Sequence, residues 1–245
     1  MIDYNLTQLY PEKTFESHVY NRDHFAHYLR WTHLLKVANT HSKILDVGCG
    51  TGEVLKVMYK NLYHPERYLG LDLRESWVNN QNKYFKNWSF KPEFKVVDLC
   101  EPYDVGKDWD LITCFEVVEH IGKQNVPRFL QNIKNAMGTE TTLLISTPCY
   151  NGKDVAKNHI INGEVGELTY DEMLQFLTEA GFKIEANYGT FASIKDYKDK
   201  LNDWQVKMFK QLSEYYDVNL LSVIMAPFFP EHSRNVIWRC KLDTN

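Results

Sequence analysis

The sequence has no long run of apolar residues. No stretch approaches the roughly 20 residues that a helix needs to cross a bilayer. Residues 1–10 contain neither the basic segment nor the apolar segment of a secretory signal peptide. We therefore expect a cytoplasmic protein without a membrane partner.

A surplus of positive charge is also missing. The chain holds 28 Lys and Arg residues against 32 Asp and Glu residues, which gives a formal net charge of -4. This balance excludes the broad cationic field that draws many proteins to nucleic acids. A nucleic-acid partner would need a local basic patch.

Cysteine is scarce and shows no pairing pattern. The five cysteines are odd in number, form no C-x-x-C pair and lie mostly in apolar, strand-like runs. We expect them to be reduced core residues.

Repeats, low-complexity segments and interdomain linkers are absent as well. The 245 residues are therefore expected to form a single domain around one sizeable core. We divide this domain into an N-terminal helical segment (1–42), a cofactor-binding core (43–193), a helical insertion (194–233) and a final strand (234–245).

Short apolar strands alternate with amphipathic helices through most of the chain. Strands are predicted at 43–47, 67–72, 94–99, 109–115, 141–146 and 234–242. Helices are predicted at 18–39, 53–61, 75–86, 126–137 and 169–180, with one long helix at 194–215. This alternation is typical of an α/β fold whose parallel sheet is covered on both faces. The first helix carries histidines without the partners that would complete a metal site, so we expect surface or half-buried positions for His18, His24, His27 and His33.

A glycine-rich turn at 48–52 joins the first strand to the next helix. Gly48, Gly50 and Gly52 free the backbone from the limits that a Cβ imposes, so a ligand can approach the main chain where the helix begins. Such a turn suits a nucleotide-like ligand, although purely structural turns share the spacing.

Carboxylates stand at the strand ends, along the edge where doubly wound sheets bind ligands. Asp46, Asp72, Asp98 and Glu116 mark the ends of the first four strands. Asp72 suits the two hydroxyls of a ribose, because a carboxylate offers two acceptor oxygens. Asp98 can accept a hydrogen bond from the exocyclic amine of a base while Leu99 packs against the ring.

Together with Asp72 and Asp98, the run Asp-Val-Gly-Cys-Gly-Thr-Gly at 46–52 resembles the class I S-adenosylmethionine-dependent methyltransferases, over about residues 43–189. The resemblance implies a Rossmann-like, doubly wound, mainly parallel seven-stranded sheet and S-adenosyl-L-methionine as cofactor. It places Gly48 and Gly50 at the methionine end, Asp46 on the sulfonium side, Asp72 at the ribose and Asp98 with Leu99 at the adenine. The cofactor-binding residues expected are Asp46, Gly48, Cys49, Gly50, Asp72, Leu73, Asp98, Leu99, Phe115 and Glu116.

Nicotinamide-dependent enzymes are the nearest alternative, because they also combine a glycine turn with an acid after the second strand. Their pyrophosphate turn prefers G-x-G-x-x-G, whereas the glycines here are spaced G-x-G-x-G. A sulfonium cofactor has no pyrophosphate, so the spacing favours the methyltransferase.

A second motif, Glu116-x-x-Glu119-His120, follows the fourth strand, and His159 lies in the loop after the fifth. The motif resembles both ubiquinone-biosynthesis-type O-methyltransferases and metal-dependent enzymes that methylate the 2′-hydroxyl at small-RNA 3′ ends. The second resemblance implies Mg²⁺ or Mn²⁺ bound by Glu116, Glu119, His120 and His159. Without a metal, His120 is the expected general base, with Glu119 beside it. The motif also occurs in methyltransferases that bind no metal, where Glu119 and His120 cap and pack.

The acceptor is expected to be an oxygen, as the hydroxyl of a small molecule or nucleotide, with an RNA end as the alternative. Enzymes that methylate base amines usually carry a polar residue, two prolines and an aromatic residue after the fourth strand, and this chain has Phe-Glu-Val-Val at 115–118. Cys149 resembles a nucleophile position only loosely and is expected to be structural. A catalytically silent cofactor-binding module also stays open, although the intact Glu116, Glu119 and His120 argue against it. The sequence identifies no protein partner.

The insertion is expected to shape the acceptor side, either as a lid over the cleft or as a helix on the sheet edge. The residues that would form its rim are Trp204, Phe228, Phe229, Pro230, His232, Arg234 and Asn235.

Overall fold

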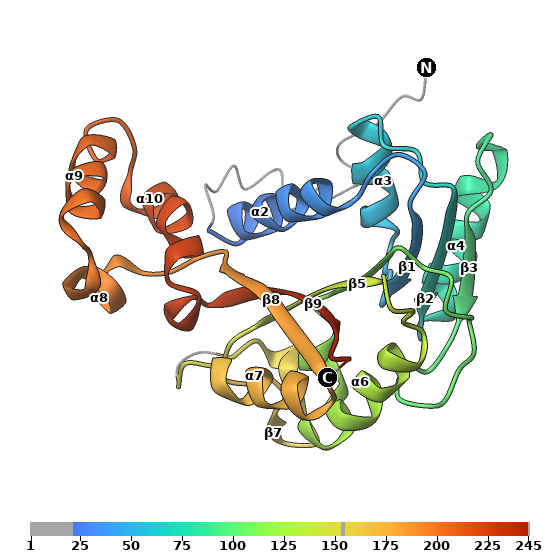
Figure 1. Ribbon diagram of the computed structural model, residues 1–245. Helices are drawn as coiled ribbons and strands as arrows, with labels where there is room; N and C mark the ends of the chain where they lie inside the picture. The colour runs from blue at the N-terminus through green and yellow to red at the C-terminus, as the bar shows by residue number, and fades with distance from the viewer. Residues whose placement is uncertain (1–21, 153–154, 245) are drawn as a thin grey trace.

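The computed structural model describes residues 22–152 and 155–244, which form a central sheet with helices on both faces and a helical lobe at one end (Figure 1). The predicted first helix is present as α2 (Arg22–Val37). Its expected start at 18–21, the segment 1–10 and the side chains of His18 and His24 lie outside what is described. Within the described part, no helix has the length and apolar character needed to cross a membrane.

Seven strands form the sheet, in the order β3-β2-β1-β4-β5-β9-β8. The strands are β1 (Lys43–Val47), β2 (Arg67–Asp72), β3 (Glu93–Val96), β4 (Leu111–Phe115), β5 (Thr142–Pro148), β8 (Phe182–Gly189) and β9 (Asn235–Leu242). The first five are parallel to one another, and β9 runs antiparallel to both β5 and β8. The predicted seven-stranded, mainly parallel sheet is thus confirmed, although the sequence pattern does not predict β8. The strand order reverses between β1 and β4, which is where sheets of this kind form a ligand crevice.

Four of the predicted strands have different bounds in the structure, and the last of them begins at 235 instead of 234. The third strand ends at Val96, before Asp98 and Leu99, because the Asp98 carboxylate accepts a hydrogen bond from the Cys100 N–H at 2.9 Å and turns the backbone out of the ladder. The fourth begins at 111 instead of 109. The fifth continues to Pro148, because β9 pairs with it that far.

Helices cover both faces of the sheet, and neighbouring residues of β1 show which helices lie on each side. Ile44 belongs to a buried cluster with Leu55 of α3, whereas Leu45 lies in a second cluster with Phe129 of α6 and Leu177 of α7. The covering helices are α3 (Glu53–Lys60), α4 (Glu75–Tyr84), followed by a 3₁₀ turn at Phe85–Asn87, α6 (Val126–Asn135) and α7 (Tyr170–Glu179).

The single long helix predicted at 194–215 is wrong. The structure has α8 (Ile194–Tyr197), a 3₁₀ turn (Lys198–Lys200) and α9 (Asp203–Leu212) instead. The break lies at Leu201, whose backbone is extended, and at Asn202, which caps α9 in a reciprocal hydrogen-bonded box with Gln205. A capping side chain competes with the helical backbone bonds, so the apolar periodicity continues while the helix does not.

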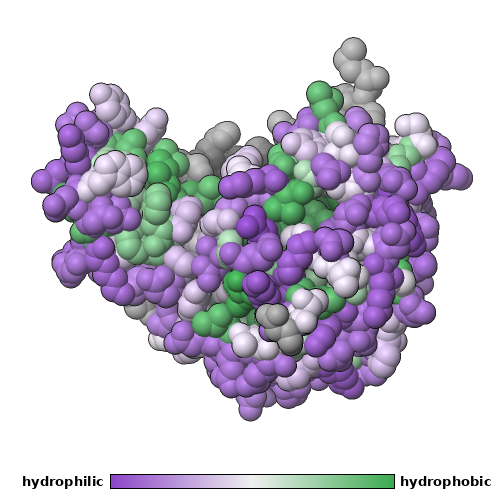
Figure 2. All heavy atoms as spheres, in the orientation of Figure 1, coloured by the Kyte–Doolittle hydropathy of each residue, from purple (hydrophilic) through white to green (hydrophobic). Residues whose placement is uncertain are grey.

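The segments around this break and α10 (Val218–Met225) together form a lobe, and this lobe has a small core of its own. Tyr197 and Phe229 stack there with ring centroids 4.4 Å apart, beside Ala192, Met225 and Ala226. Figure 2 shows green apolar atoms on the side of this lobe that faces the body of the molecule.

Candidate active site

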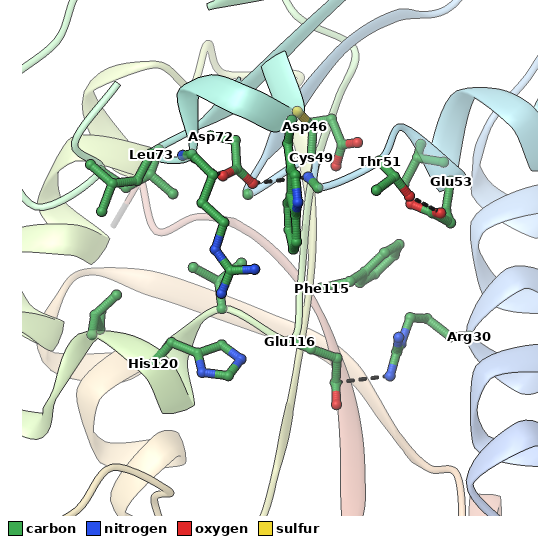
Figure 3. Close-up of a pocket in the computed structure, with 18 of the residues that line it drawn as sticks. Arg30, Asp46, Cys49, Thr51, Glu53, Asp72, Leu73, Phe115, Glu116 and His120 are labelled. Atoms are coloured by element: carbon green, nitrogen blue, oxygen red, sulfur yellow. Dashed lines mark hydrogen bonds and ion pairs between the residues drawn. The ribbon is translucent and has the colours of Figure 1, made fainter. Parts of the chain in front are cut away.

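A cavity of about 640 Å³ opens at the carboxyl ends of β1, β2 and β4. All ten residues expected to bind the cofactor line it, together with His120. Figure 3 shows Asp46, Asp72 and Thr51 along one side, and Arg30, Glu116 and His120 across from them. The cavity therefore has a carboxylate-rich side near the glycine turn and a second side built from α2 and the end of β4.

The glycine turn is held close to the loop after β4. Gly48 has a φ of 77°, and a Cβ at this position would lie 2.2 Å from Cγ2 of Val117. Only glycine fits such a contact in this conformation. The N–H groups of Gly48 and Cys49 donate to the Leu71 carbonyl, at 2.8 and 2.9 Å, so the turn is tied to β2.

Asp46 is buried under this turn. It is 3% exposed, and its carboxylate accepts hydrogen bonds from the hydroxyls of Tyr68 at 2.5 Å and Thr113 at 2.7 Å. Burial raises the pKa of Asp46 to about 7, the two hydroxyls oppose the shift, and the charges of Glu53 and Asp72 add to it. Asp46 is therefore a buried carboxyl poised to change charge near neutral pH.

Asp72 lies at the end of β2 with its oxygens directed to the backbone. One oxygen accepts from the Gly50 N–H at 3.0 Å and the other from the Arg74 N–H at 2.8 Å. Each carboxylate oxygen can accept a second hydrogen bond, so a diol can still be bound. Leu99 is buried on the cavity wall, while Leu73 is 62% exposed at its mouth.

Glu116 and Arg30 form an ion pair that the sequence analysis did not predict. Glu116 has a φ of 56°, uncommon for a residue with a side chain, and its carboxylate lies 2.9 Å from Nη2 of Arg30. It also accepts hydrogen bonds at 2.9 Å from Ser146 and Asn235. Arg30 is 4% exposed and precedes the buried Leu34 by one helical turn. A basic residue on the apolar stripe of α2 is the sequence signal that could have indicated this pair.

Glu119, His120 and His159 come together beside the cavity. Their ligating atoms lie within 4.8 Å of one another, with His120 Nε2 at 3.9 Å from Glu119 Oε1. Glu119 is 1% exposed and accepts a hydrogen bond from the Thr147 hydroxyl at 2.9 Å. The predicted fourth member, Glu116, is engaged by Arg30 and is not part of this group.

A short hairpin that the sequence analysis missed brings His159 into this group. Strands β6 (Ile160–Ile161) and β7 (Glu164–Val165) follow His159 directly and return the chain to Gly166. A Cβ at Gly166 would lie 2.3 Å from the Glu119 carbonyl oxygen, so glycine is required for the hairpin to pack against α5 (Val118–Ile121). Two-residue strands carry no periodicity that a sequence pattern can detect.

The electrostatics of the group favour a neutral imidazole. Burial lowers the pKa of His120, and burial together with the nearby Glu116 charge raises the pKa of Glu119 well above its usual range. The Nδ1 atom of His120 lies 3.2 Å from the Asn158 carbonyl, which can only accept, so Nδ1 carries the proton and Nε2 holds the lone pair. His120 can thus take a proton or bind a cation through Nε2.

Two residues directly after the insertion, Arg234 and Asn235, contact this region. Asn235 contacts Glu116, and Arg234 lies 2.7 Å from Glu167, which follows the hairpin. Trp204 is 61% exposed, and none of the expected rim residues is among the described residues that line the large cavity.

Comparison with known proteins agrees with this geometry. The model of a family described as methyltransferase domain matches residues 20–225. A ubiquinone biosynthesis O-methyltransferase of Rickettsia akari is 27% identical over 206 residues, which cover 79% of this chain and 72% of that protein.

Solved structures share the fold. An S-adenosylmethionine-dependent methyltransferase from Mesorhizobium loti has a TM-score of 0.58 at 16% identity, covering 90% of this chain and all of the other. A TehB-like methyltransferase from Corynebacterium glutamicum has a TM-score of 0.57 at 18% identity, covering 87% of each chain. The glycine turn, the strand order and the family match lead to one conclusion: this chain belongs to the methyltransferase domain family, as a class I S-adenosylmethionine-dependent methyltransferase.

Proposed function

We propose that the enzyme transfers a methyl group to the hydroxyl oxygen of a small-molecule or nucleotide acceptor, with His120 as general base. The observation that carries this proposal is the position of His120, which lines the cavity opposite Asp46 and Asp72 (Figure 3) and keeps Nε2 free to accept a proton. The name of the Rickettsia relative, an O-methyltransferase, supports an oxygen acceptor.

The carboxylate side of the cavity suits the cofactor. When bound, S-adenosylmethionine supplies a methyl group on a positively charged sulfur that leaves as a neutral thioether. Asp46 and Asp72 would face that positive charge and the ribose hydroxyls, respectively, because both line the cavity beside the glycine turn. A cofactor held by these residues would present its methyl group toward Glu116 and His120, and such positioning accounts for about 7 to 11 kcal/mol of rate acceleration in well-oriented reactions.

The acceptor side would position the hydroxyl and remove its proton. Phe115 and Trp31 provide aromatic surface there, with ring centroids 5.9 Å apart. The oxygen would attack the methyl carbon as His120 Nε2 takes the hydroxyl proton. Only an acceptor that carries a proton needs such a base, and a positioned base typically contributes about 10² to 10⁴ in rate.

A divalent cation is the alternative to His120 as base, because Nε2 has one lone pair and cannot bind a cation and take a proton at the same time. Glu119, His120 and His159 would hold the cation, and their one carboxylate and two imidazoles fit Mn²⁺ better than Mg²⁺, which prefers oxygen ligands. Both imidazoles direct Nδ1 to an acceptor, His120 to the Asn158 carbonyl and His159 to Glu167, as metal-ligating histidines usually do. A cation bound there would lower the pKa of an acceptor hydroxyl. The four-ligand set expected from the sequence becomes a three-residue set in this proposal.

The same cluster supports one alternative acceptor, the 2′-hydroxyl at an RNA 3′ end. The net charge of -4 gives no general attraction to RNA, so this alternative rests on the cluster alone.

The test measures formation of S-adenosylhomocysteine with three acceptor types: a catechol, a nucleoside and an RNA oligonucleotide with a free 3′ end. His120→Asn should lower turnover by about 10² to 10⁴, whereas the control His41→Asn, at an exposed histidine outside the cavity lining, should not. Equal turnover in wild type and His120→Asn would refute the base. A rate that survives exhaustive chelation would refute the metal. Cofactor binding without turnover on any acceptor or in a cell extract would indicate a silent module.

A further inference from the structure

Glu167 is a fully buried carboxylate that does not line the large cavity. It is 0% exposed, and one oxygen, Oε1, lies 2.7 Å from His159 Nδ1 and 2.7 Å from Arg234 Nη2. Its other oxygen, Oε2, is buried without a hydrogen-bond partner among the described residues. All the bonding of this carboxylate is therefore directed through Oε1 to one imidazole and one guanidinium.

Burying a carboxylate is costly, so its presence in the core needs a reason. Arg234 supplies the opposite charge and is itself held by a 2.8 Å hydrogen bond from Nη1 to the Cys149 carbonyl. Such buried pairs often stabilise a protein no better than apolar residues of the same size. The stability of the fold therefore does not explain the Glu167–Arg234 pair, whereas a role in orienting His159 does.

The hairpin explains why Glu167 can reach His159. The Gly166 N–H donates to the His159 carbonyl at 2.7 Å, which closes the hairpin and places residue 167 beside the ring of residue 159. The ring centroid of His159 lies 4.9 Å from that of His120, so its orientation decides which nitrogen is available to the group.

We infer that Glu167 is a positioning residue that fixes the tautomer of His159. Its Oε1 accepts a hydrogen bond from Nδ1–H, which leaves Nε2 of His159 unprotonated and available to the group with Glu119 and His120. The inference rests on the proposed function of that group, but the tautomer itself can be measured without a metal or a substrate.

The experiment begins with long-range ¹⁵N–¹H spectra of the histidine rings, recorded without metal at a pH well above the ordinary histidine pKa of about 6.5. The His159 signals are assigned by comparison with His159→Gln. We expect wild-type protein to show His159 protonated only at Nδ1. A His159 that is protonated at Nε2, or that mixes both tautomers, would overturn the inference whatever the variants do.

Variants then test whether Glu167 is the cause. Glu167→Gln should let both His159 tautomers appear and should weaken Mn²⁺ binding by about 10- to 100-fold. Affinity for S-adenosylhomocysteine should stay at the wild-type value, which shows that the variant is folded. The control is Glu164→Gln, an exposed residue of the same hairpin, which should change neither measurement. An unchanged His159 spectrum in folded Glu167→Gln would overturn the assignment.

Failure of the metal proposal looks different. If wild-type protein binds no Mn²⁺ but the His159 tautomer is fixed in wild type and released in Glu167→Gln, the positioning role stands and the metal proposal falls.

Discussion

Replacing Asp46 with asparagine is expected to stabilise the protein above neutral pH and to weaken cofactor binding. Asp46 is buried, and burial raises its pKa from 3.8 to about 7. Asparagine has almost the same shape but no charge to bury. Its amide can still bond to the hydroxyls of Tyr68 and Thr113, since each hydroxyl can donate or accept.

The size of this stability change follows from the difference between the pKa of Asp46 in the folded protein and its pKa in the unfolded chain. Because the folded-state pKa is the higher one, the folded protein binds more protons than the unfolded chain between about pH 4 and pH 7, and stability falls as the pH rises through this window. One pH unit of pKa difference corresponds to about 1.4 kcal/mol, so the wild type loses about 4 kcal/mol by the time Asp46 is fully ionised. The Asp46→Asn variant avoids this loss, and its advantage should therefore grow from about pH 4 to about pH 8.

The assay is urea unfolding of wild type and Asp46→Asn at several pH values across this range. Because the other titrating groups are common to both proteins, the difference between the two free energies of unfolding isolates Asp46. Calorimetric titration should show a larger loss of affinity for S-adenosylmethionine, which carries a positive sulfur, than for S-adenosylhomocysteine, which does not. A stability difference that stays constant with pH, or that moves against the variant as the pH rises, would refute the reasoning.

Three further substitutions test the packing of the site. Gly48→Ala should cost about 1 to 3 kcal/mol of stability from its positive φ alone, and more from the clash with Val117. Adding Val117→Ala should remove the cost of the clash but not the cost of the positive φ, and thermal unfolding of the single and double variants measures both. Arg234→Met should leave the Glu167 carboxylate buried without its ion pair and cost about 3 to 5 kcal/mol in urea unfolding; a loss below about 1 kcal/mol would show that Glu167 does not depend on it. Cys149→Ser should keep full turnover, because burial raises the pKa of this thiol far from neutrality; loss of activity in the folded variant would restore a nucleophilic role.

The two halves of the site differ in how much the sequence could predict. Every residue expected to bind the cofactor lines the cavity, because each stands on a strand end or turn that is visible in the local sequence. Even there, the third strand stops before Asp98, since a local side-chain bond redirects the backbone. The prediction of one long helix at 194–215 was wrong for the same reason, a local side-chain hydrogen bond. Asn202 caps a new helix at a point where the apolar periodicity alone predicts that the first helix continues.

The sequence by itself determined the fold class and the side of the cavity beside the glycine turn, because that turn and the strand-end carboxylates are local motifs whose side chains must meet once parallel strands share an edge. Only the tertiary structure decided the opposite side. Arg30 meets Glu116 from a helix that precedes the sheet, Asn235 meets the same carboxylate from 119 positions further along the chain, and His159 arrives on a hairpin of two-residue strands. Such contacts are set by how helices, loops and an antiparallel strand pack around the sheet. A basic residue on the apolar stripe of α2 indicates that Arg30 has a buried partner, but no local pattern identifies that partner as Glu116.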